Sequence, residues 1–263
     1  GLTRPELAVL LSSAKLALQA AIEASPLPDD PGLEAELLAA FPGPMRVKFK
    51  GDILDHRLRR EIIATKLANR LVNRLGLIHP FELAEEEGAS LAQTAAAFVA
   101  AEQLFGLAET WQRIETAPMS EGARIMLFDR AAAALSDHIA DLLRIGGHTC
   151  EPSKLVAELQ GGGAELTRNP ESLLSLEVRA QSGRMRSALA EAGAPEAEAA
   201  LVVQLQDVDG SIGIARLARE TGCTARAITA AFGDLGTRLG LDWAQQTAAR
   251  MSPSDPWERL LVN

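Results

Sequence analysis

The sequence contains no tyrosine, and aromatic residues make up only 4% of its 263 residues. Aromatic and β-branched residues are enriched in strands, and a sheet open to water on one face needs alternating apolar and polar residues. No window of the sequence shows such alternation between hairpin turns. These absences argue against a β-sheet protein and favour an all-α fold.

Cysteines and long apolar runs are also scarce. Cys150 and Cys223 are the only cysteines. They are too few for a disulfide framework, so we expect a reducing, cytoplasmic compartment. No apolar run approaches the roughly 20 residues of a membrane span, and no signal peptide opens the chain, so we expect no membrane partner. The chain starts GLTRPEL without an initiator Met, and we expect it to be a piece of a longer protein.

Positive charge is in the minority, with 26 Lys and Arg against 35 Asp and Glu and a formal net charge of −9. A protein that binds nucleic acid or anionic lipid mainly by electrostatic attraction needs clustered positive charge. The composition therefore disfavours both partners. Hydrophobic residues make up 47% and charged residues 23%, which is typical of a soluble globular protein.

Capping signals mark the starts of several helices. Thr3, Pro5 and Glu6 have the pattern of a capping box, and Leu2 and Leu7 are spaced for a hydrophobic staple over the same turn. The sequence predicts an all-α, multi-helix, bundle-like array with no significant sheet. Further helices are expected over LEAELLAAF before Pro42, from near Pro44, after the caps Ser90 and Ser120, and from near Pro152, Pro170, Pro195, Ser211 and Thr224.

Two glycine-rich stretches divide the chain. GGHTC at 146–150 and GGG at 161–163 interrupt the helical pattern. We predict a first helical subdomain over 1–147, a linker region over 148–168, and a second helical subdomain over 169–263.

The most basic segment is HRLRREIIATKLANRLVNRLG at 56–76. At about 100° per residue, its leucines and isoleucines cover a broad apolar sector of a helix, and basic residues form a narrow stripe opposite. A buried helix with a solvated basic side is the favoured interpretation, and docking of the stripe on another protein surface is the alternative. The stripe consists of Arg59, Lys66, Arg70 and Arg74. Three further charged residues project toward the apolar side and need partners there: Arg57, Arg60 and Glu61.

No pattern in the sequence supports catalysis. The Gly161–Gly163 triplet lacks the third glycine of a dinucleotide fingerprint, and no strand precedes it. Two groups contain possible metal ligands, but neither has a second ligand pair at zinc-like spacing, and the helical Asp-His-Asp group is typical of solvated surface. We assign no catalytic, cofactor-binding or metal-binding residue. The two groups are His148, Cys150 and Glu151, and Asp137, His138 and Asp141.

Residues 214–233 have the outline of a helix-turn-helix. Ala218 is small where two helices would cross, Gly222 suits the turn, and Ile228 would be buried. However, the second helix carries one basic residue, Arg226, and residues 195–263 hold nine acids against six Lys and Arg, a net charge of −3. A helix pair without a DNA-binding role is favoured, and a DNA-binding regulator is the alternative.

Three segments resemble one known family. They are GLTRPELAVLLSSAK at 1–15, LRREIIATKLANRLVNRLG at 58–76 and LGLDW at 239–243. They are similar to the C-terminal helical region of the large bacterial NAD-specific glutamate dehydrogenases. In that family the region follows the catalytic part, where glutamate and NAD bind, and family members continue past the segment that matches DPWERLL.

The resemblance implies a non-catalytic C-terminal piece of an enzyme that converts L-glutamate, NAD and water to 2-oxoglutarate, ammonia and NADH. The glycine-rich segment with the substrate-binding lysine is missing here, so no catalytic residue is carried over and NAD is expected only in the parent enzyme. The implied role is structural, in assembly or regulatory. The expected partners are the catalytic part of the same polypeptide and further copies of the parent. We also expect the carboxylates that neutralise the basic stripe to come from those partners.

Overall fold

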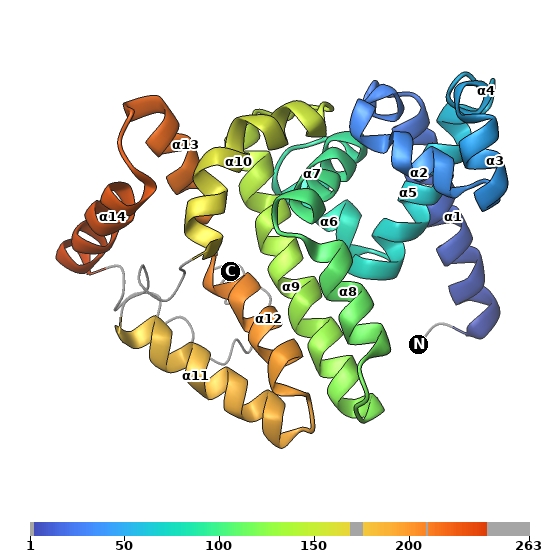
Figure 1. Ribbon diagram of the computed structural model, residues 1–263. Helices are drawn as coiled ribbons and strands as arrows, with labels where there is room; N and C mark the ends of the chain where they lie inside the picture. The colour runs from blue at the N-terminus through green and yellow to red at the C-terminus, as the bar shows by residue number, and fades with distance from the viewer. Residues whose placement is uncertain (1–2, 169–175, 209, 241–263) are drawn as a thin grey trace.

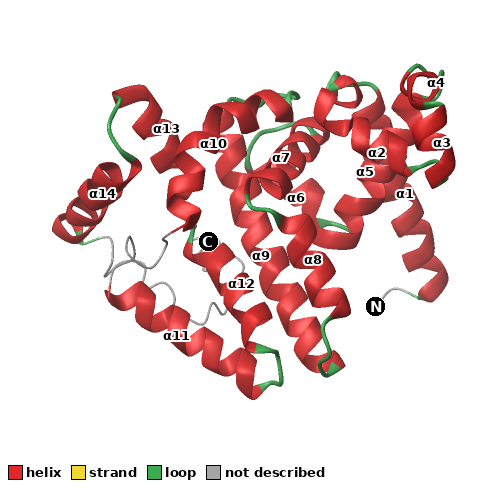
Figure 2. Cartoon of the chain, in the orientation of Figure 1, coloured by secondary structure: helices red, strands yellow, loops and turns green. Residues whose placement is uncertain are grey.

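The computed structural model describes residues 3–168, 176–208 and 210–240, and these residues form helices joined by short turns (Figures 1 and 2). No strand occurs in the described ranges. The predicted all-α, multi-helix fold is therefore confirmed. The elements are α1 (Arg4–Glu23), the 3-10 turns η1 (Leu27–Asp29) and η2 (Pro31–Leu33), α2 (Glu34–Ala39), α3 (Gly43–Lys48), α4 (Lys50–Leu54), α5 (Arg59–Leu75), α6 (His79–Glu86), α7 (Leu91–Leu104), α8 (Leu107–Thr116), α9 (Glu121–Gly146), α10 (Pro152–Arg168), α11 (Leu176–Glu191), α12 (Glu196–Asp207), α13 (Ser211–Thr221) and α14 (Ala225–Leu239).

The predicted helix starts agree with the structure where it describes them. The Glu6 carboxylate accepts hydrogen bonds from the Thr3 backbone N–H and hydroxyl, both at 2.7 Å. Ser90 and Ser120 are the N-caps of α7 and α9, and each hydroxyl accepts a backbone N–H three residues on. The staple partner Leu2 and the start near Pro170 lie outside the described residues.

Helices α7 and α9 form the centre of the molecule (Figure 1). The alanine-rich α7 is buried on all sides from Ala95 to Ala101, with Phe98 fully enclosed. Small side chains let neighbouring helices approach closely, and α7 packs against both α9 and α10. Helices α8 and α12 flank α9, and α1 to α5 lie together at the right of Figure 1.

The segment predicted as a linker is largely helical. Residues 152–168 form α10, which packs against α7 and α13. Leu155 and Leu159 of α10 are buried in a hydrophobic cluster that also contains residues of α1 and α13. The apolar i, i+4 spacing of these two leucines explains the packing, because it places both on one face of a helix. The division into two subdomains stays a prediction.

The predicted helix pair at 214–233 is present as a packing unit. Gly222 ends α13 with φ 68°, a left-handed conformation that favours glycine. Ala218 and Ala225 are buried between α13 and α14, with Ile214 and Ile228 packed against them.

One feature of α1 differs from the expectation based on apolar runs. By length and composition α1 could cross a membrane, with a mean hydropathy of 1.3 over its most apolar window. The bent pair α7 and α8 passes the same test only if taken as one broken span. Polar residues divide α1 into short apolar runs, so the helix contains no uninterrupted run of that length; they are Ser12, Ser13, Lys15 and Gln19.

Candidate interaction surface on helix α5

Helix α5 has two sharply different sides. Its buried side contacts α1, α2, α6, α7 and α9, and consists of Ile63, Ala64, Leu67, Ala68, Leu71 and Val72. Three predicted members of the apolar sector are less buried: Ile62 and Leu75 are partly exposed, and Leu58 is exposed at the N-cap. All four stripe residues lie in this helix, which begins at Arg59. Successive stripe residues are seven, four and four positions apart, and this spacing places them on one side of the helix, as predicted.

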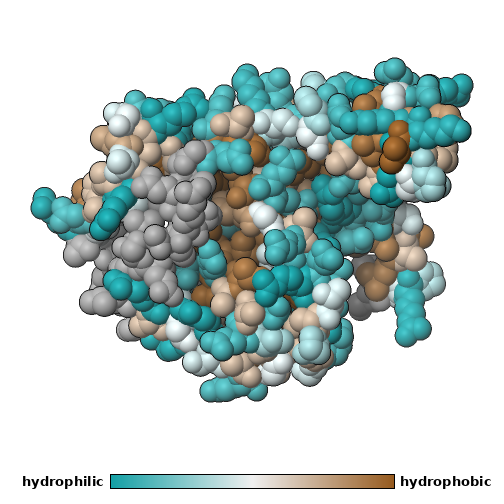
Figure 3. All heavy atoms as spheres, in the orientation of Figure 1, coloured by the Kyte–Doolittle hydropathy of each residue, from teal (hydrophilic) through white to brown (hydrophobic). Residues whose placement is uncertain are grey.

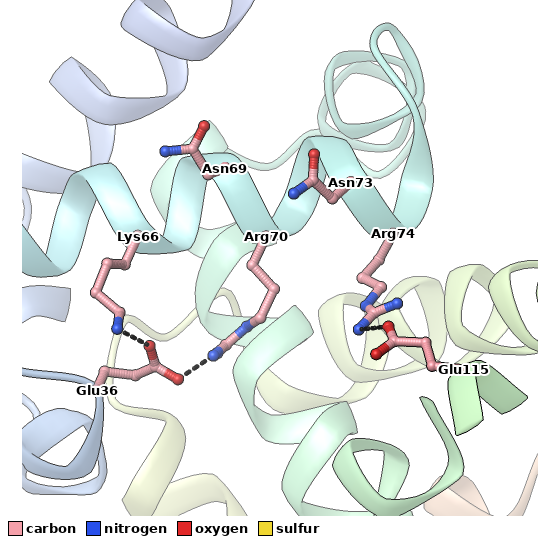
Figure 4. Close-up of a pocket in the computed structure, with 7 residues that line it drawn as sticks. All are labelled: Glu36, Lys66, Asn69, Arg70, Asn73, Arg74 and Glu115. Atoms are coloured by element: carbon pink, nitrogen blue, oxygen red, sulfur yellow. Dashed lines mark hydrogen bonds and ion pairs between the residues drawn. The ribbon is translucent and has the colours of Figure 1, made fainter. Parts of the chain in front are cut away.

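Each stripe residue has a carboxylate partner in this chain. Glu36 of α2 lies between Lys66 and Arg70, and its carboxylate pairs with both (Figure 4). Arg70 Nε also lies 3.0 Å from Glu102 Oε2, and Arg74 Nη2 lies 3.0 Å from Glu115 Oε1. At the start of the helix, Arg59 pairs with Asp29. The expectation that these carboxylates come from other parts of an enzyme is therefore wrong.

The later stripe residues are packed against aromatic rings of the core. The Arg70 guanidinium lies 5.5 Å from the centre of the Phe98 ring, and the Arg74 guanidinium lies 4.7 Å from that of Trp111. The Arg70 and Arg74 side chains are 26% and 22% exposed. A fully solvated side, the favoured interpretation from the sequence, does not describe these two residues. Docking of the stripe on a further protein surface stays a prediction.

The charged residues beside the stripe differ in their environments. Arg60 pairs with Asp29 and donates hydrogen bonds to the carbonyl oxygens of Glu23 and Ser25 at 2.6 and 2.7 Å. It therefore satisfies free carbonyls at the C-terminal end of α1. Partial burial alone would raise the pKa of Asp29, but Arg59 and Arg60 outweigh it and lower that pKa. Arg57 is exposed in the turn before α5, and Glu61 is half-buried.

A pocket of about 460 Å³ lies along the stripe. Figure 4 shows Lys66, Arg70 and Arg74 extending to the same side of α5, toward Glu36 and Glu115. Because each cation already has a carboxylate within ion-pair distance, the pocket does not offer an uncompensated positive charge to an anion. The remaining lining residues are Asn69 and Asn73.

Glu102 is the most buried acid of this network, with its side chain 10% exposed. Burial raises the pKa of the Glu102 carboxyl, although the positive charges of Arg70 and Arg74 act in the opposite direction. The nearby Glu36 adds to the increase. The Glu102 carboxylate is therefore partly desolvated within this network, and the desolvation disfavours its charged form.

Replacing Glu102 with Gln is expected to change how stability depends on pH. Because its pKa in the folded protein lies above the reference value of 4.5, Glu102 binds a proton more readily in the folded state than in the unfolded state. Its contribution to the free energy of unfolding is thus greatest below pH 4.5 and falls as the pH rises through the folded pKa. In denaturant titrations, Glu102→Gln should therefore gain stability relative to wild type as the pH rises from 4.5 through the folded-state pKa of Glu102.

Glu115→Gln is the matched control, since it removes a more exposed carboxylate of the same network. A difference between wild type and Glu102→Gln that stays constant across this pH range would contradict the assignment of a raised pKa to Glu102.

In the group of Asp137, His138 and Asp141, which the sequence suggests is solvated surface, Asp137 is exposed but His138 is buried. His138 is 1% exposed, and its ring stacks on Phe105 with centres 3.9 Å apart. Its Nε2 lies 3.0 Å from the carbonyl oxygen of Leu205, which can only accept, so Nε2 is the donor. His138 therefore links α9 to the last turn of α12.

The second candidate group is not arranged for nucleophilic chemistry either. Burial raises the pKa of the Cys150 thiol, and the negative charge of Glu151 acts in the same direction. A reactive cysteine needs the thiolate, which this environment disfavours. Among the residues that the structure describes, no three or more His, Cys, Asp or Glu side chains lie together in a way that could hold a metal ion.

The sequence of this helical array is similar to those of known proteins. A family model described as "Glutamate dehydrogenase, C-terminal" matches residues 1–263. The chain belongs to this family. It is 32% identical over 262 residues to the NAD-specific glutamate dehydrogenase of Halomonas elongata, and 29% identical over 268 residues to that of Pseudomonas aeruginosa. These matches cover 98% and 99% of the chain. A third relative of the same name, from Mycobacterium tuberculosis, is 31% identical over 188 residues, 69% of the chain and 12% of that relative.

The chain spans 16% of the length of the Halomonas and Pseudomonas relatives. Together with the C-terminal family model, this coverage shows that the chain corresponds to the C-terminal part of these relatives. The relatives are NAD-specific, but the glycine triplet of this chain does not fit an NAD site, because residues 161–163 lie inside α10. A dinucleotide fingerprint needs a strand, a glycine turn and then a helix, so that backbone N–H groups at the helix start face the pyrophosphate.

The sequence predicts the stripe but not its carboxylate partners. Asp29, Glu36, Glu102 and Glu115 lie on other elements, and nothing in their local sequence distinguishes them from solvated acids. One general signal for such partners exists in the sequence: the chain has more Asp and Glu than Lys and Arg, so it contains enough carboxylates to form ion pairs with the basic side of α5.

Proposed function

We propose that this chain is a non-catalytic helical region that stabilises a larger NAD-dependent glutamate dehydrogenase by packing against the rest of its polypeptide. The parent would oxidise L-glutamate with NAD and water to 2-oxoglutarate, ammonia and NADH. In this proposal NAD and glutamate bind outside the chain, which carries no cofactor, and the parent is a cytoplasmic homo-oligomer.

The observation that carries this proposal is the match to the C-terminal family model along the whole chain, combined with its 16% share of the relatives' length. The four stripe residues are paired within the chain, and His138 of one candidate metal group links α9 to α12. These features support a role in assembly rather than in the chemical step.

The test is removal of this region from the complete dehydrogenase polypeptide. We expect the shortened enzyme to lose its native assembly state in sedimentation velocity, together with most of its activity. Activity and assembly that both match those of the intact enzyme would contradict the proposed role.

A DNA-binding regulator is the alternative function, based on the α13–α14 pair. That pair has a packed core of Ala218, Ala225, Ile214 and Ile228, which accounts for its sequence pattern without DNA. Basic residues of α14 are sparse, and Arg238 is paired with Asp234 at 3.0 Å.

Gel-shift measurements on mixed-sequence duplexes are expected to show no complex. Low salt favours any phosphate contact, so titrations at low ionic strength are the most permissive condition. A retained complex that weakens steeply with added salt would support the DNA-binding alternative instead.

A further inference from the structure

The first half of α1 is an apolar helical arm that the described part of the chain leaves uncovered. Every residue from Thr3 to Ser13 is exposed. The exposed large side chains include Leu7 at 45%, Leu10 at 37% and Leu11 at 38%. The arm extends away from the other helices at the right of Figure 1, and hydrophobic atoms are visible on its surface in Figure 3.

The exposed leucines continue the face that α1 buries further along. Ala14, Leu18 and Ile22 pack into the core, mainly against α5. Leu7 and Leu11 precede them at the same helical spacing of three to four residues, so the five side chains form one stripe. The second half of the stripe is covered by this chain, whereas the first half is not. Polar residues on the opposite side of the helix include Ser12 and Ser13.

The arm is helical because its own sequence specifies a helix start. Thr3 and Glu6 form a complete capping box, and Pro5 occupies the first turn. A helix end that is capped locally presents a rigid surface before any partner arrives. An apolar face of this kind on a soluble protein marks an interaction site.

We propose that the Leu7, Leu10 and Leu11 face of α1 docks against the rest of the dehydrogenase polypeptide. This inference rests on the proposed function. In the relatives, 16% of the polypeptide matches this chain, and the matching family model is the C-terminal one, so most of the remaining polypeptide precedes α1. Direct covalent connection to the start of α1 gives that part a high effective concentration at the arm.

A membrane is a poorer occupant of this face. Leu18 and Ile22 in the second half of α1 are completely buried against protein, so the helix cannot span a bilayer without leaving the core. Arg4, Glu6 and Lys15 also place charge along the arm.

The test is hydrogen exchange of the complete dehydrogenase polypeptide, followed at the amides of residues 7–13. Leu7→Gln/Leu11→Gln removes the apolar face and keeps a similar helix propensity. We expect these amides to exchange about tenfold faster in the double variant than in wild type, because local opening no longer breaks a docked contact. Ser12→Gln/Ser13→Gln is the control on the polar side and should exchange at the wild-type rate. Unchanged protection of α9 amides in all three proteins shows that the region remains folded.

Equal exchange in wild type and Leu7→Gln/Leu11→Gln would overturn the docking proposal. If removal of the whole region still disrupts assembly in that case, the proposed function stands, and only the assignment of this α1 face as the docking surface is wrong. Wild-type protection that disappears on dilution would indicate a second copy as the occupant and would also overturn the proposal. So would flotation of the enzyme with phosphatidylglycerol vesicles if the double variant loses it.

Discussion

Reversing Lys66 and Arg70 to Glu is expected to destabilise the 263-residue chain itself by about 3–5 kcal/mol. The structural reason is that Arg70 joins Glu36 to Glu102, whose side chain is 10% exposed. Removing the guanidinium leaves a buried carboxylate without its closest positive charge, and the two new glutamates add repulsion. Urea titration of the variant should therefore show a clearly lower midpoint than wild type.

The matched control is Lys154→Glu/Arg238→Glu, which reverses one lysine and one arginine at exposed positions. Their side chains are 67% and 74% exposed and make local pairs with Glu151 and Asp234. Such surface pairs contribute about 1 kcal/mol or less. A Lys66→Glu/Arg70→Glu variant as stable as this control would contradict the internal pairing of the stripe.

The second large effect is expected at His138. Replacing His138 with Ala removes a ring stacked on Phe105 and leaves the Leu205 carbonyl without the imidazole donor. The loss of buried volume and of one buried hydrogen bond should together lower the free energy of unfolding by about 3 kcal/mol. Thermal denaturation followed by circular dichroism measures this loss.

His148→Asn is the control for removing a histidine. His148 is exposed and has φ 55°, a conformation that asparagine tolerates well. The control should unfold within about 0.5 kcal/mol of wild type, as surface substitutions usually do. If His138→Ala were equally stable, His138 would not be the link between α9 and α12 that the structure describes.

Helix starts could be predicted from the sequence because their chemistry is local. Thr3 with Glu6, Ser90 and Ser120 each act on N–H groups within three residues, and the structure reproduces all three caps. The face of α5 could be predicted for the same reason, since helical periodicity alone places Leu67 and Leu71 on one side.

The environments of charged and polar residues could not be predicted in this way. Arg70 meets Glu36 across 34 positions of sequence, and Arg74 meets Glu115 across 41. Whether a basic stripe faces water or carboxylates is decided by which helices pack beside it, and periodicity holds no information on that. His138 was misjudged for the same reason, because its burial depends on the distant α12.

A run of glycines does not by itself decide between a linker and a helix, because packing of the flanking residues can stabilise the helix. The triplet at 161–163 suggested a linker, because glycine lowers helix propensity by about 1 kcal/mol per residue. Helix α10 nevertheless continues through it, since Leu155 and Leu159 anchor the helix in the core. Tertiary contacts thus outweigh the local preference at this position.

We propose that this chain contributes packing surfaces to a dehydrogenase and no binding site for its substrates. The decisive measurement is calorimetric titration of the 263-residue chain with NAD, in the absence and presence of L-glutamate. We predict no saturable heat in either titration, while the complete enzyme titrated under the same conditions binds NAD. A saturating NAD isotherm with the isolated chain would overturn this proposal, because it would require a nucleotide site among its own residues.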